Sequence, residues 1–303
     1  MTLPKVSVVT VNFRQPDVTC DMLETLAVCG YSNLEVIIVD NGSLSDESAR
    51  WNYYYPNIVH IRSEENLGFA GGTNLGIKAA TGDFILMLNN DTYVSPGFLE
   101  PMVQLLGQYA HVGIVSPRIV FSEPKDTIQY AGAFIGQPIL GRGTKIGHME
   151  IDEGQYSDVR DTELPHGACM LVRKELFELI GLLPEFYFMY FEEHDFAVRV
   201  RKLGFSIMFC GTSSIRHRQS VSMGVGNPRK TYYLHRNRVV FYQRMLSRGA
   251  FLAFYAYYLF VGVPLNIFRF LKAGRIDHIR AMGRAIWWNL HRMLGLPTPQ
   301  HKI

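Results

Sequence analysis

The stretch Phe84-Ile85-Leu86-Met87-Leu88-Asn89-Asn90-Asp91-Thr92 decides the fold class. Five consecutive apolar residues are typical of a strand that is buried on both faces, as in a parallel sheet covered by helices. The run then stops at polar side chains, and ligands of open α/β sheets collect at the carboxyl ends of strands. Asp91 is therefore either an ordinary turn residue or a hard oxygen ligand for a divalent cation.

Strand and helix patterns alternate from the N-terminus up to this stretch, which predicts a parallel sheet flanked by helices. Residues 129–163 are rich in glycine and acidic residues and are predicted to be loop. The other predicted strands are 6–11, 34–39, 57–62, 113–117 and 205–209, and the predicted helices are 17–28, 68–80, 96–109 and 173–180.

Several glycines open the predicted helix 68–80. They do not form a dinucleotide-binding fingerprint, because G-x-G-x-x-G must follow the first strand and these glycines follow the third. Two interpretations stay open. The glycines allow close packing of helix on sheet, or they let the backbone approach a phosphate or sugar at a helix N-terminus. The residues concerned are Gly68, Gly71, Gly72 and Gly76.

Asp40 ends the second predicted strand, so it shares the carboxyl edge of the sheet with Asp91. A carboxylate in this place can cap the following turn. It can also accept a hydrogen bond from the ring N–H of a pyrimidine. Two acidic strand ends on one edge favour the second interpretation, with one carboxylate for a base and the other for a metal ion.

A second polar cluster, Glu192-Glu193-His194-Asp195, follows an aromatic run and opens a basic helix. Carboxylates at a helix N-terminus can act simply as caps. Crowding and partial burial raise a carboxyl pKa, which suits a general base. Helical spacing places Glu192 and Asp195 on one face and Glu193 on another. His217, predicted to lie in a loop after a strand, is a candidate metal ligand.

Composition limits the class of protein. The 303 residues suffice for one large α/β domain with an appendage. The four cysteines form no C-x-x-C pair, so we expect reduced thiols in a cytosolic setting. Residues 1–11 lead directly into a strand pattern, so no signal peptide is predicted.

Charge is distributed unevenly along the chain. Residues 229–303 hold thirteen Lys/Arg and one acidic residue, which leaves seventeen basic and twenty-six acidic residues before them. This basic tail contains an uncharged apolar stretch, 250–267, interrupted by Gly262 and Pro264, and a basic amphipathic pattern over 276–294. Such a pattern favours helices lying at an anionic membrane surface over a membrane span or nucleic-acid binding. The alternative is a helical subdomain packed on the body or on a second subunit, as in a homo-oligomer.

Six pieces of the sequence, in this order and spacing, match one known family. The chain resembles the inverting family-2 glycosyltransferases of the GT-A fold, in particular their rhamnosyltransferase-like branch, over roughly residues 5–245. The matching pieces are Val6–Asn12, Val39–Ser43, Asn66–Asn74, Leu88–Thr92, His166–Gly204 and Tyr232–Arg238.

The resemblance implies a GT-A-type, Rossmann-like mixed sheet, mostly parallel and flanked by helices, in a domain over 1–245, with a helical tail over 246–303. It implies a nucleoside-diphosphate sugar donor (dTDP or UDP), a glycan or lipid-linked acceptor, and Mg²⁺ or Mn²⁺. Asp91, Asn89 and His217 would bind the metal, with Asn89 standing where the family's D-x-D motif has its first Asp. Glu193 aligns best with the catalytic base, ahead of Glu192 and Asp195. The donor would contact Asp40, Asn12, Asn66, Gly68, Asn74 and Asn90.

Two alternatives stay open at this point. A sugar nucleotidyltransferase also uses a metal and a nucleotide on a parallel sheet, but it would carry a basic, glycine-rich loop after the first strand, unlike Asn12–Pro16. A non-catalytic nucleotide-sugar-binding membrane scaffold is compatible with the Asn at position 89. The basic tail and a lipid-linked acceptor together predict a cytoplasmic protein bound peripherally to the inner face of the plasma membrane.

Overall fold

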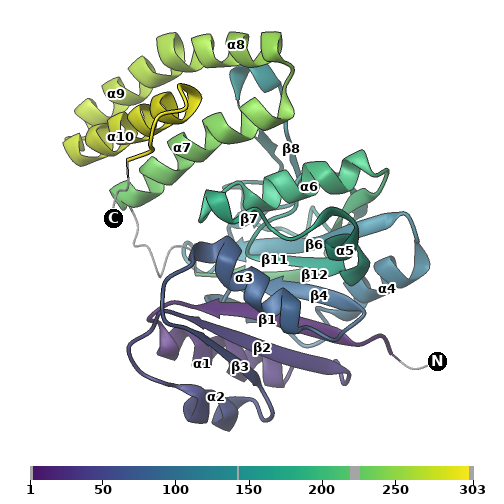
Figure 1. The fold of residues 1–303 in the computed structure, drawn as a ribbon. Helices are drawn as coiled ribbons and strands as arrows, with labels where there is room; N and C mark the ends of the chain where they lie inside the picture. The colour runs from purple at the N-terminus through teal and green to yellow at the C-terminus, as the bar shows by residue number, and fades with distance from the viewer. Residues whose placement is uncertain (1–2, 142, 219–225, 300–303) are drawn as a thin grey trace. The chain divides into compact units, whose positions relative to one another are not determined.

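The computed structural model describes residues 3–141, 143–218 and 226–299 (Figure 1). The chain forms two compact units. The first comprises residues 1–134, 145–188 and 192–222, and the second comprises 135–144, 189–191 and 223–303. The helix that precedes residue 245 thus groups with the C-terminal helices. A functional domain boundary at 245 stays a prediction.

The first unit is built on one mixed sheet with the strand order β10-β12-β6-β11-β4-β1-β2-β3. The strands β3-β2-β1-β4 are all parallel, as the alternating pattern predicted, whereas β11 runs antiparallel between β4 and β6. The strands are β1 (Val6–Asn12), β2 (Leu34–Asn41), β3 (Val59–Ser63), β4 (Phe84–Leu88), β5 (Thr92–Val94), β6 (Val112–Phe121), β7 (Ile128–Tyr130), β10 (Val159–Thr162), β11 (Cys169–Arg173) and β12 (Ser206–His217).

Helices flank this sheet (Figure 1). All five residues of β4 are buried, as expected for a strand covered on both faces. The four cysteines are buried and unpaired. The helices of the unit are α1 (Pro16–Ala27), α2 (Ser48–Tyr54), α3 (Gly68–Ala79), α4 (Glu100–Gln108), α5 (Lys174–Ile180), η2 (Glu185–Tyr187) and α6 (Glu192–Lys202).

Two predictions about this unit were wrong. The segment predicted as loop, 129–163, contains short strands, β8 (Ala133–Phe134), β9 (Thr144–Lys145) and β10, besides the end of β7. His217 is the last residue of β12, and it does not lie in a loop beyond the strand. In both places polar residues form strands because neighbouring strands pair with them, and tertiary context overrides weak strand propensity.

The second unit is helical. It contains η1 (Pro138–Leu140), α7 (Pro228–Met245), α8 (Arg248–Tyr257), η3 (Tyr258–Gly262), α9 (Val263–Lys272) and α10 (Ile276–Met293). Tyr232 of α7 packs with Ala281 and Ala285 of α10 in its core.

Gly262 and Pro264 do not end the helix that runs from α8 into α9. The intervening η3 is a π-helical turn, closed by a hydrogen bond from the Val263 N–H to the Tyr258 carbonyl. A π turn has i→i+5 hydrogen bonds, one residue longer than those of an α-helix. This local change lets the helix continue past Pro264, which has no N–H to donate. The side-chain amide of Asn266 also donates to the Gly262 carbonyl. Residues 248–272 therefore form one long, bulged helix.

The contact between α3 and the sheet gives a first prediction. A Cβ added at Gly76 would lie 2.4 Å from Val9 Cγ1 and 3.3 Å from Val39 Cγ2. We expect Gly76→Ala to lower the free energy of unfolding by about 1–3 kcal/mol, because α3 must move off β1. Gly107→Ala is the matched control, since nothing lies within 4 Å of its added Cβ. It should stabilise by about 0.5–1 kcal/mol. Urea unfolding measures both, and a stabilising Gly76→Ala would contradict the packing.

Candidate active site

Asp40 is fully buried at the end of β2. Its Oδ1 accepts a hydrogen bond from the Asn12 side-chain amide at 3.1 Å. Its Oδ2 is buried and forms no hydrogen bond within the described residues, and the nearest cation is Arg62, whose Nε lies 4.0 Å away. A buried carboxylate oxygen without a donor is costly. Asp40 Oδ2 is therefore suited to a donor on a ligand.

A chain of buried hydrogen bonds connects Asp40 to the end of β4. Asn12, at the end of β1, donates to Asp40 and accepts from the Thr19 hydroxyl at 3.0 Å. Thr19 Oγ1, on α1, accepts in turn from the Asn90 side-chain amide at 3.1 Å. The ends of three neighbouring strands are thus held together by side chains whose orientation is fixed by their partners.

Asp91 and His217 meet at the same edge. The imidazole Nε2 of His217 lies 3.1 Å from Asp91 Oδ1, and both side chains are buried. Backbone pairing produces this contact, because Thr92 of β5 pairs with His217 of β12, and the Arg218 N–H donates to the Asp91 carbonyl. Residues 126 positions apart in the chain are therefore brought together by an antiparallel strand pair.

The other nitrogen of His217 determines the tautomer. Its Nδ1 lies 2.8 Å from Gln129 Oε1, and with the Gln129 amide in this orientation Nδ1 donates its proton to that oxygen. In the neutral ring Nε2 then presents a lone pair to the Asp91 carboxylate. Two facing lone-pair donors repel unless a proton or a cation lies between them. Metal-ligating histidines are commonly oriented by such a bond from their second nitrogen.

The pair has the right separation for a shared divalent cation. Ligands at about 2.1 Å on neighbouring corners of an octahedron lie about 3.0 Å apart. Within the described residues, no group of three His, Cys, Asp or Glu side chains could hold a metal ion. Mg²⁺ characteristically binds through one or two protein ligands and completes its shell with water and substrate phosphates, so two protein ligands suffice.

Asn89 lies beside this pair. Its N–H donates to the Ala168 carbonyl, and its own carbonyl accepts from the Thr92 hydroxyl. These bonds fix the main chain at the end of β4 and connect it to the turn that precedes β11.

Glu193 reaches the same turn from α6. Its carboxylate lies against Gly167, 3.5 Å from the position that a Cβ would take there. Oε2 is buried and forms no hydrogen bond within the described residues, while Oε1 lies 3.9 Å from His194 Nε2. Gly167 precedes Ala168, which bonds Asn89. The structure therefore brings Glu193 to the edge that holds Asn89 and Asp91.

Positive and neutral groups surround this carboxylate. Desolvation lowers the pKa of Lys145, and the Glu193 carboxylate opposes that shift. Burial, with the neighbouring His217 and Lys145, lowers the pKa of His166 well below its usual value, so its ring is neutral. Burial also lowers the pKa of His194. The His166 and His217 ring centroids are 6.1 Å apart, so His166 lies next to the pair of Asp91 and His217.

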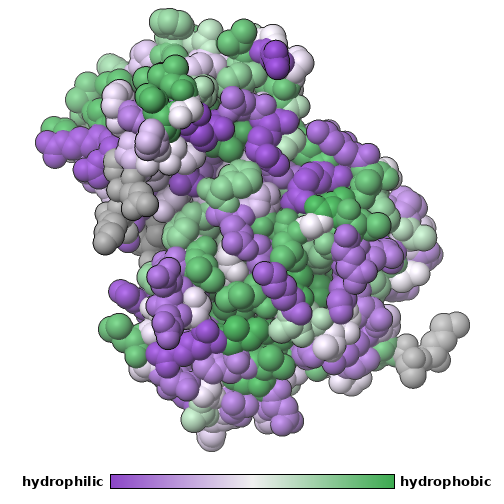
Figure 2. All heavy atoms as spheres, in the orientation of Figure 1, coloured by the Kyte–Doolittle hydropathy of each residue, from purple (hydrophilic) through white to green (hydrophobic). Residues whose placement is uncertain are grey.

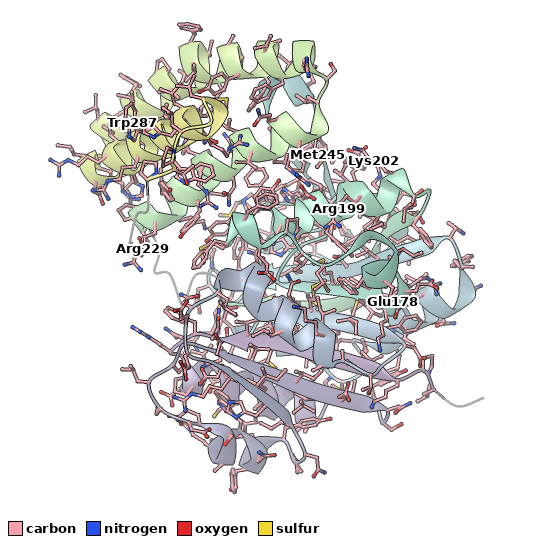
Figure 3. The ribbon with its side chains drawn as sticks, in the orientation of Figure 1. Glu178, Arg199, Lys202, Arg229, Met245 and Trp287 are labelled. Carbon is pink, nitrogen blue, oxygen red and sulfur yellow. The ribbon has the colours of Figure 1, made fainter. Side chains whose placement is uncertain are left out.

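Glu192 and Asp195 face the interior, at 3% and 0% exposure, in agreement with the helical spacing. Asp195 binds Arg199 Nε at 3.0 Å and accepts from the Tyr187 hydroxyl at 3.1 Å. Arg199 also donates to the carbonyls of Ile180 and Leu182, so it holds the turn after α5 (Figure 3). Asp195 thus has structural partners on both of its oxygens, and Glu193 is the carboxylate directed to the sheet edge.

The remaining predicted donor-site residues hold α3. Asn66 Oδ1 accepts from the Gly68 N–H at 2.9 Å. Gly68 has a φ of +74°, and an added Cβ would lie 2.3 Å from the Phe188 carbonyl oxygen. Asn74 is buried, with its amide bonded to Leu183 and Glu185. These contacts, like those of Gly76, agree with the close-packing interpretation of the glycine-rich helix.

Four residues of the edge were not predicted from the sequence: Thr19, Gln129, Lys145 and His166. Each is an ordinary residue of a helix, a short strand or a turn. His166 was quoted only as part of the turn before β11. Strand pairing brings these residues to the sheet edge, so their spacing in the sequence does not indicate that they belong to the site.

Comparisons with known proteins agree with this geometry. The model of glycosyl transferase family 2 matches residues 7–181, more than half of the chain. The low-salt glycan biosynthesis hexosyltransferase Agl10 of Haloferax volcanii is 27% identical over 226 residues, which cover 72% of this chain and 69% of Agl10. The N-acetylglucosaminyl-diphospho-decaprenol L-rhamnosyltransferase of Mycobacterium tuberculosis is 24% identical over 225 residues, 67% of this chain and 72% of that protein.

A solved structure shows the same fold. The mannosyltransferase PcManGT from Pyrobaculum calidifontis, in complex with GDP-Man and Mn²⁺, has a TM-score of 0.57 and 15% identity, over 98% of this chain and 77% of that one. At this identity the likeness concerns the fold alone. The family match, covering β2 with Asp40 and the turn after β4 with Asp91, shows that the chain belongs to glycosyl transferase family 2 and transfers a sugar from a nucleotide-sugar donor.

Proposed function

We propose that this protein is a metal-dependent inverting glycosyltransferase of glycan biosynthesis that moves a sugar from a pyrimidine nucleoside diphosphate to a lipid-linked or glycan acceptor at a membrane surface. The observation that carries the proposal is the buried pair of Asp91 and His217, 3.1 Å apart, with the His217 tautomer set by Gln129. A pair arranged in this way accommodates a divalent cation better than it accommodates solvent.

Asp91 and His217 would hold Mg²⁺ or Mn²⁺, with Asn89 beside them. When bound, the ion neutralises negative charge that develops on the leaving diphosphate. Among solved structures of this fold, PcManGT contains GDP-Man with Mn²⁺, and a GalNAc-T7 structure contains UDP, GalNAc and Mn²⁺. These complexes support a divalent ion here and leave open which metal is used.

Asp40 would recognise the base. Its Oδ1 is occupied by Asn12, and the buried Oδ2 can accept the ring N–H of uracil or thymine. A cytosine ring offers no N–H at the same position, so dTDP and UDP donors are favoured. Asn90, in the hydrogen-bond chain that ends at Asp40, contributes to the donor site by fixing Asn12 through Thr19.

Glu193 would act as general base. An acceptor hydroxyl is a weak nucleophile at neutral pH, so Glu193 Oε2 takes its proton as the hydroxyl oxygen attacks the sugar C1. The new C1–O bond forms as the bond from C1 to the diphosphate oxygen breaks, and the electron pair leaves on the nucleoside diphosphate. A single displacement inverts C1. Lys145, which interacts electrostatically with Glu193, would stabilise the charge of the carboxylate.

A lipid-linked acceptor agrees with the C-terminal helices. The mycobacterial relative is named for rhamnosyl transfer to N-acetylglucosaminyl-diphospho-decaprenol, which supports rhamnose as donor sugar and a lipid-linked acceptor. No residue of α9 is buried, and Phe268 and Leu271 are more than half exposed. Figure 2 shows apolar residues gathered over these helices. The helix 248–272 is long and apolar enough to cross a membrane by length and composition.

Peripheral contact explains the helix better than a span. Arg269 and Lys272 lie in the last turn of α9, and α10 adds Arg280 and Arg284. Basic residues beside an exposed apolar face are typical of helices that lie on anionic lipid. We place the enzyme on the inner face of the plasma membrane.

The base assignment predicts the effect of Glu193→Gln. This change removes the proton acceptor and keeps the shape, so we expect kcat to fall by about 100-fold or more, with donor affinity within about twofold of the wild type. Radiolabelled sugar transfer measures kcat. Glu178→Gln, an exposed glutamate of α5 (Figure 3), is the control and should leave kcat unchanged. Near-normal turnover of Glu193→Gln would move the role to Glu192.

The metal pair predicts that His217→Ala and Asp91→Ala each abolish metal-dependent donor binding. Isothermal titration of UDP and dTDP, with and without Mn²⁺, should show a metal-dependent gain of at least about tenfold in the wild type and none in either variant. His111→Ala removes an exposed histidine and should retain the full gain. Equal metal dependence in His217→Ala would show that the imidazole is not a ligand.

The membrane proposal predicts that Phe268→Glu combined with Leu271→Glu removes vesicle binding. Both side chains are exposed on α9, and burying a carboxylate in the lipid interface is unfavourable. Sedimentation with vesicles of phosphatidylglycerol and phosphatidylcholine measures binding, and wild-type binding should weaken with added salt. Leu179→Glu, equally exposed on α5, is the control. Undiminished sedimentation of the double variant would refute contact through α9.

A further inference from the structure

The three residues that precede α6 include backbone conformations that are rarely adopted by side-chain-bearing residues. Tyr190 and Phe191 have φ angles of +67° and +79°, and Phe188, just before them, has +66°. Bulky residues keep such angles only when the surrounding structure enforces them. The next residue is Glu192, the first of α6, so this segment determines where the helix that carries Glu193 begins.

The Asn237 side chain binds the main chain of this segment. The Asn237 amide, on α7, donates to the Met189 carbonyl at 2.7 Å and to the Tyr190 carbonyl at 2.9 Å. Asn237 is fully buried. These two carbonyls belong to the peptide groups on either side of Tyr190, so the amide holds the main chain at the residue whose φ is +67°.

Arg236 orients the Asn237 amide. Its Nε donates to Asn237 Oδ1 at 2.7 Å, so the NH₂ group must point to the segment before α6. The guanidinium is itself fixed between aromatic rings, 5.0 Å from the Tyr233 centroid and 4.8 Å from that of Trp288. Trp288 belongs to α10, so the C-terminal helix contributes to this support.

We propose that Asn237 is a positioning residue for the general base, acting through the main chain of residues 189–191, with Arg236 and Trp288 orienting its amide. The proposal rests on the role of Glu193 in the proposed function. Neither Asp nor Leu can replace Asn here, because only the amide offers two donors to two carbonyls and an acceptor to Arg236.

The test is Asn237→Leu, which keeps the volume and removes both donors. We expect kcat to fall by about 10–100-fold, because a base displaced by an ångström loses its alignment. Affinity for UDP and dTDP with Mn²⁺, measured by calorimetry, should stay within about twofold. Hydrogen exchange of the amides over 188–193 should accelerate. A folded variant with wild-type kcat, or one that loses donor affinity in parallel with kcat, would overturn the proposal.

Asn289→Leu is the matched control. Asn289 is also fully buried in the helical unit, and its amide donates to the main-chain carbonyls of Arg236 and Ala285, not to residues 189–191. It should lower the melting temperature as Asn237→Leu does and leave kcat within about twofold. An equal loss of kcat in both variants would show that general destabilisation is the cause.

A second variant covers the case in which Asn237→Leu does not fold. Arg236→Met keeps apolar contact with the aromatic rings and leaves the Asn237 amide in place without its orienting donor. We expect a smaller loss of kcat, about three- to tenfold, with the same acceleration of exchange. Wild-type kcat in folded Arg236→Met, with exchange unchanged, would overturn the proposal.

A double-mutant cycle separates this proposal from the base assignment. If Asn237 acts through Glu193, adding Asn237→Leu to Glu193→Gln should cause no further loss of kcat. Additive losses would overturn the positioning role. Near-normal turnover of Glu193→Gln alone would refute the assignment of Glu193 as general base. An inactive Glu193→Gln variant together with a fully active Asn237→Leu variant would refute only the positioning role of Asn237.

Discussion

Three buried polar atoms at one sheet edge form no hydrogen bond within the described residues, and the rest of the fold keeps them in place. They are Asp40 Oδ2, His217 Nε2 and Glu193 Oε2. Each such atom costs roughly 1–3 kcal/mol when its partner is missing. Such an atom calls for an explanation, and a ligand that supplies the missing partner is one. A pyrimidine N–H, a divalent cation and an acceptor hydroxyl are the partners that the proposed function assigns to these three atoms.

Much of the scaffold could be predicted from short-range patterns. The apolar runs that end at Asp40 and Asp91 gave the parallel strands and their shared carboxyl edge. Helical spacing separated Glu193 from Glu192 and Asp195, and their burial agrees. The assignment of these residues to base recognition, metal binding and proton transfer remains a proposal, since contacts alone do not identify a reaction.

What sequence patterns missed depends on long-range pairing. Gln129 lies in β7, a three-residue strand with no signature of its own, yet it sets the tautomer of His217. β12 extends to His217 because β5 and β6 pair with polar residues that would not form a strand alone. Thr19 looks like any residue of an amphipathic helix, although it joins two strand ends. Periodicity reports which face is apolar, and it cannot report which polar side chains meet.

The strained segment before α6 shows how the helical unit enters the chemistry. Non-glycine residues at positive φ cost of order 1–3 kcal/mol each, so the angles at 188, 190 and 191 take a noticeable part of a total stability of about 5–15 kcal/mol. The two amide bonds from Asn237 and the contact of the Phe191 ring with Phe241, 5.5 Å between centroids, offset that cost. These offsets come from α7, and Trp288 of α10 lies over the Arg236 guanidinium, so residues 189–191 depend on contacts within the helical unit to which they belong.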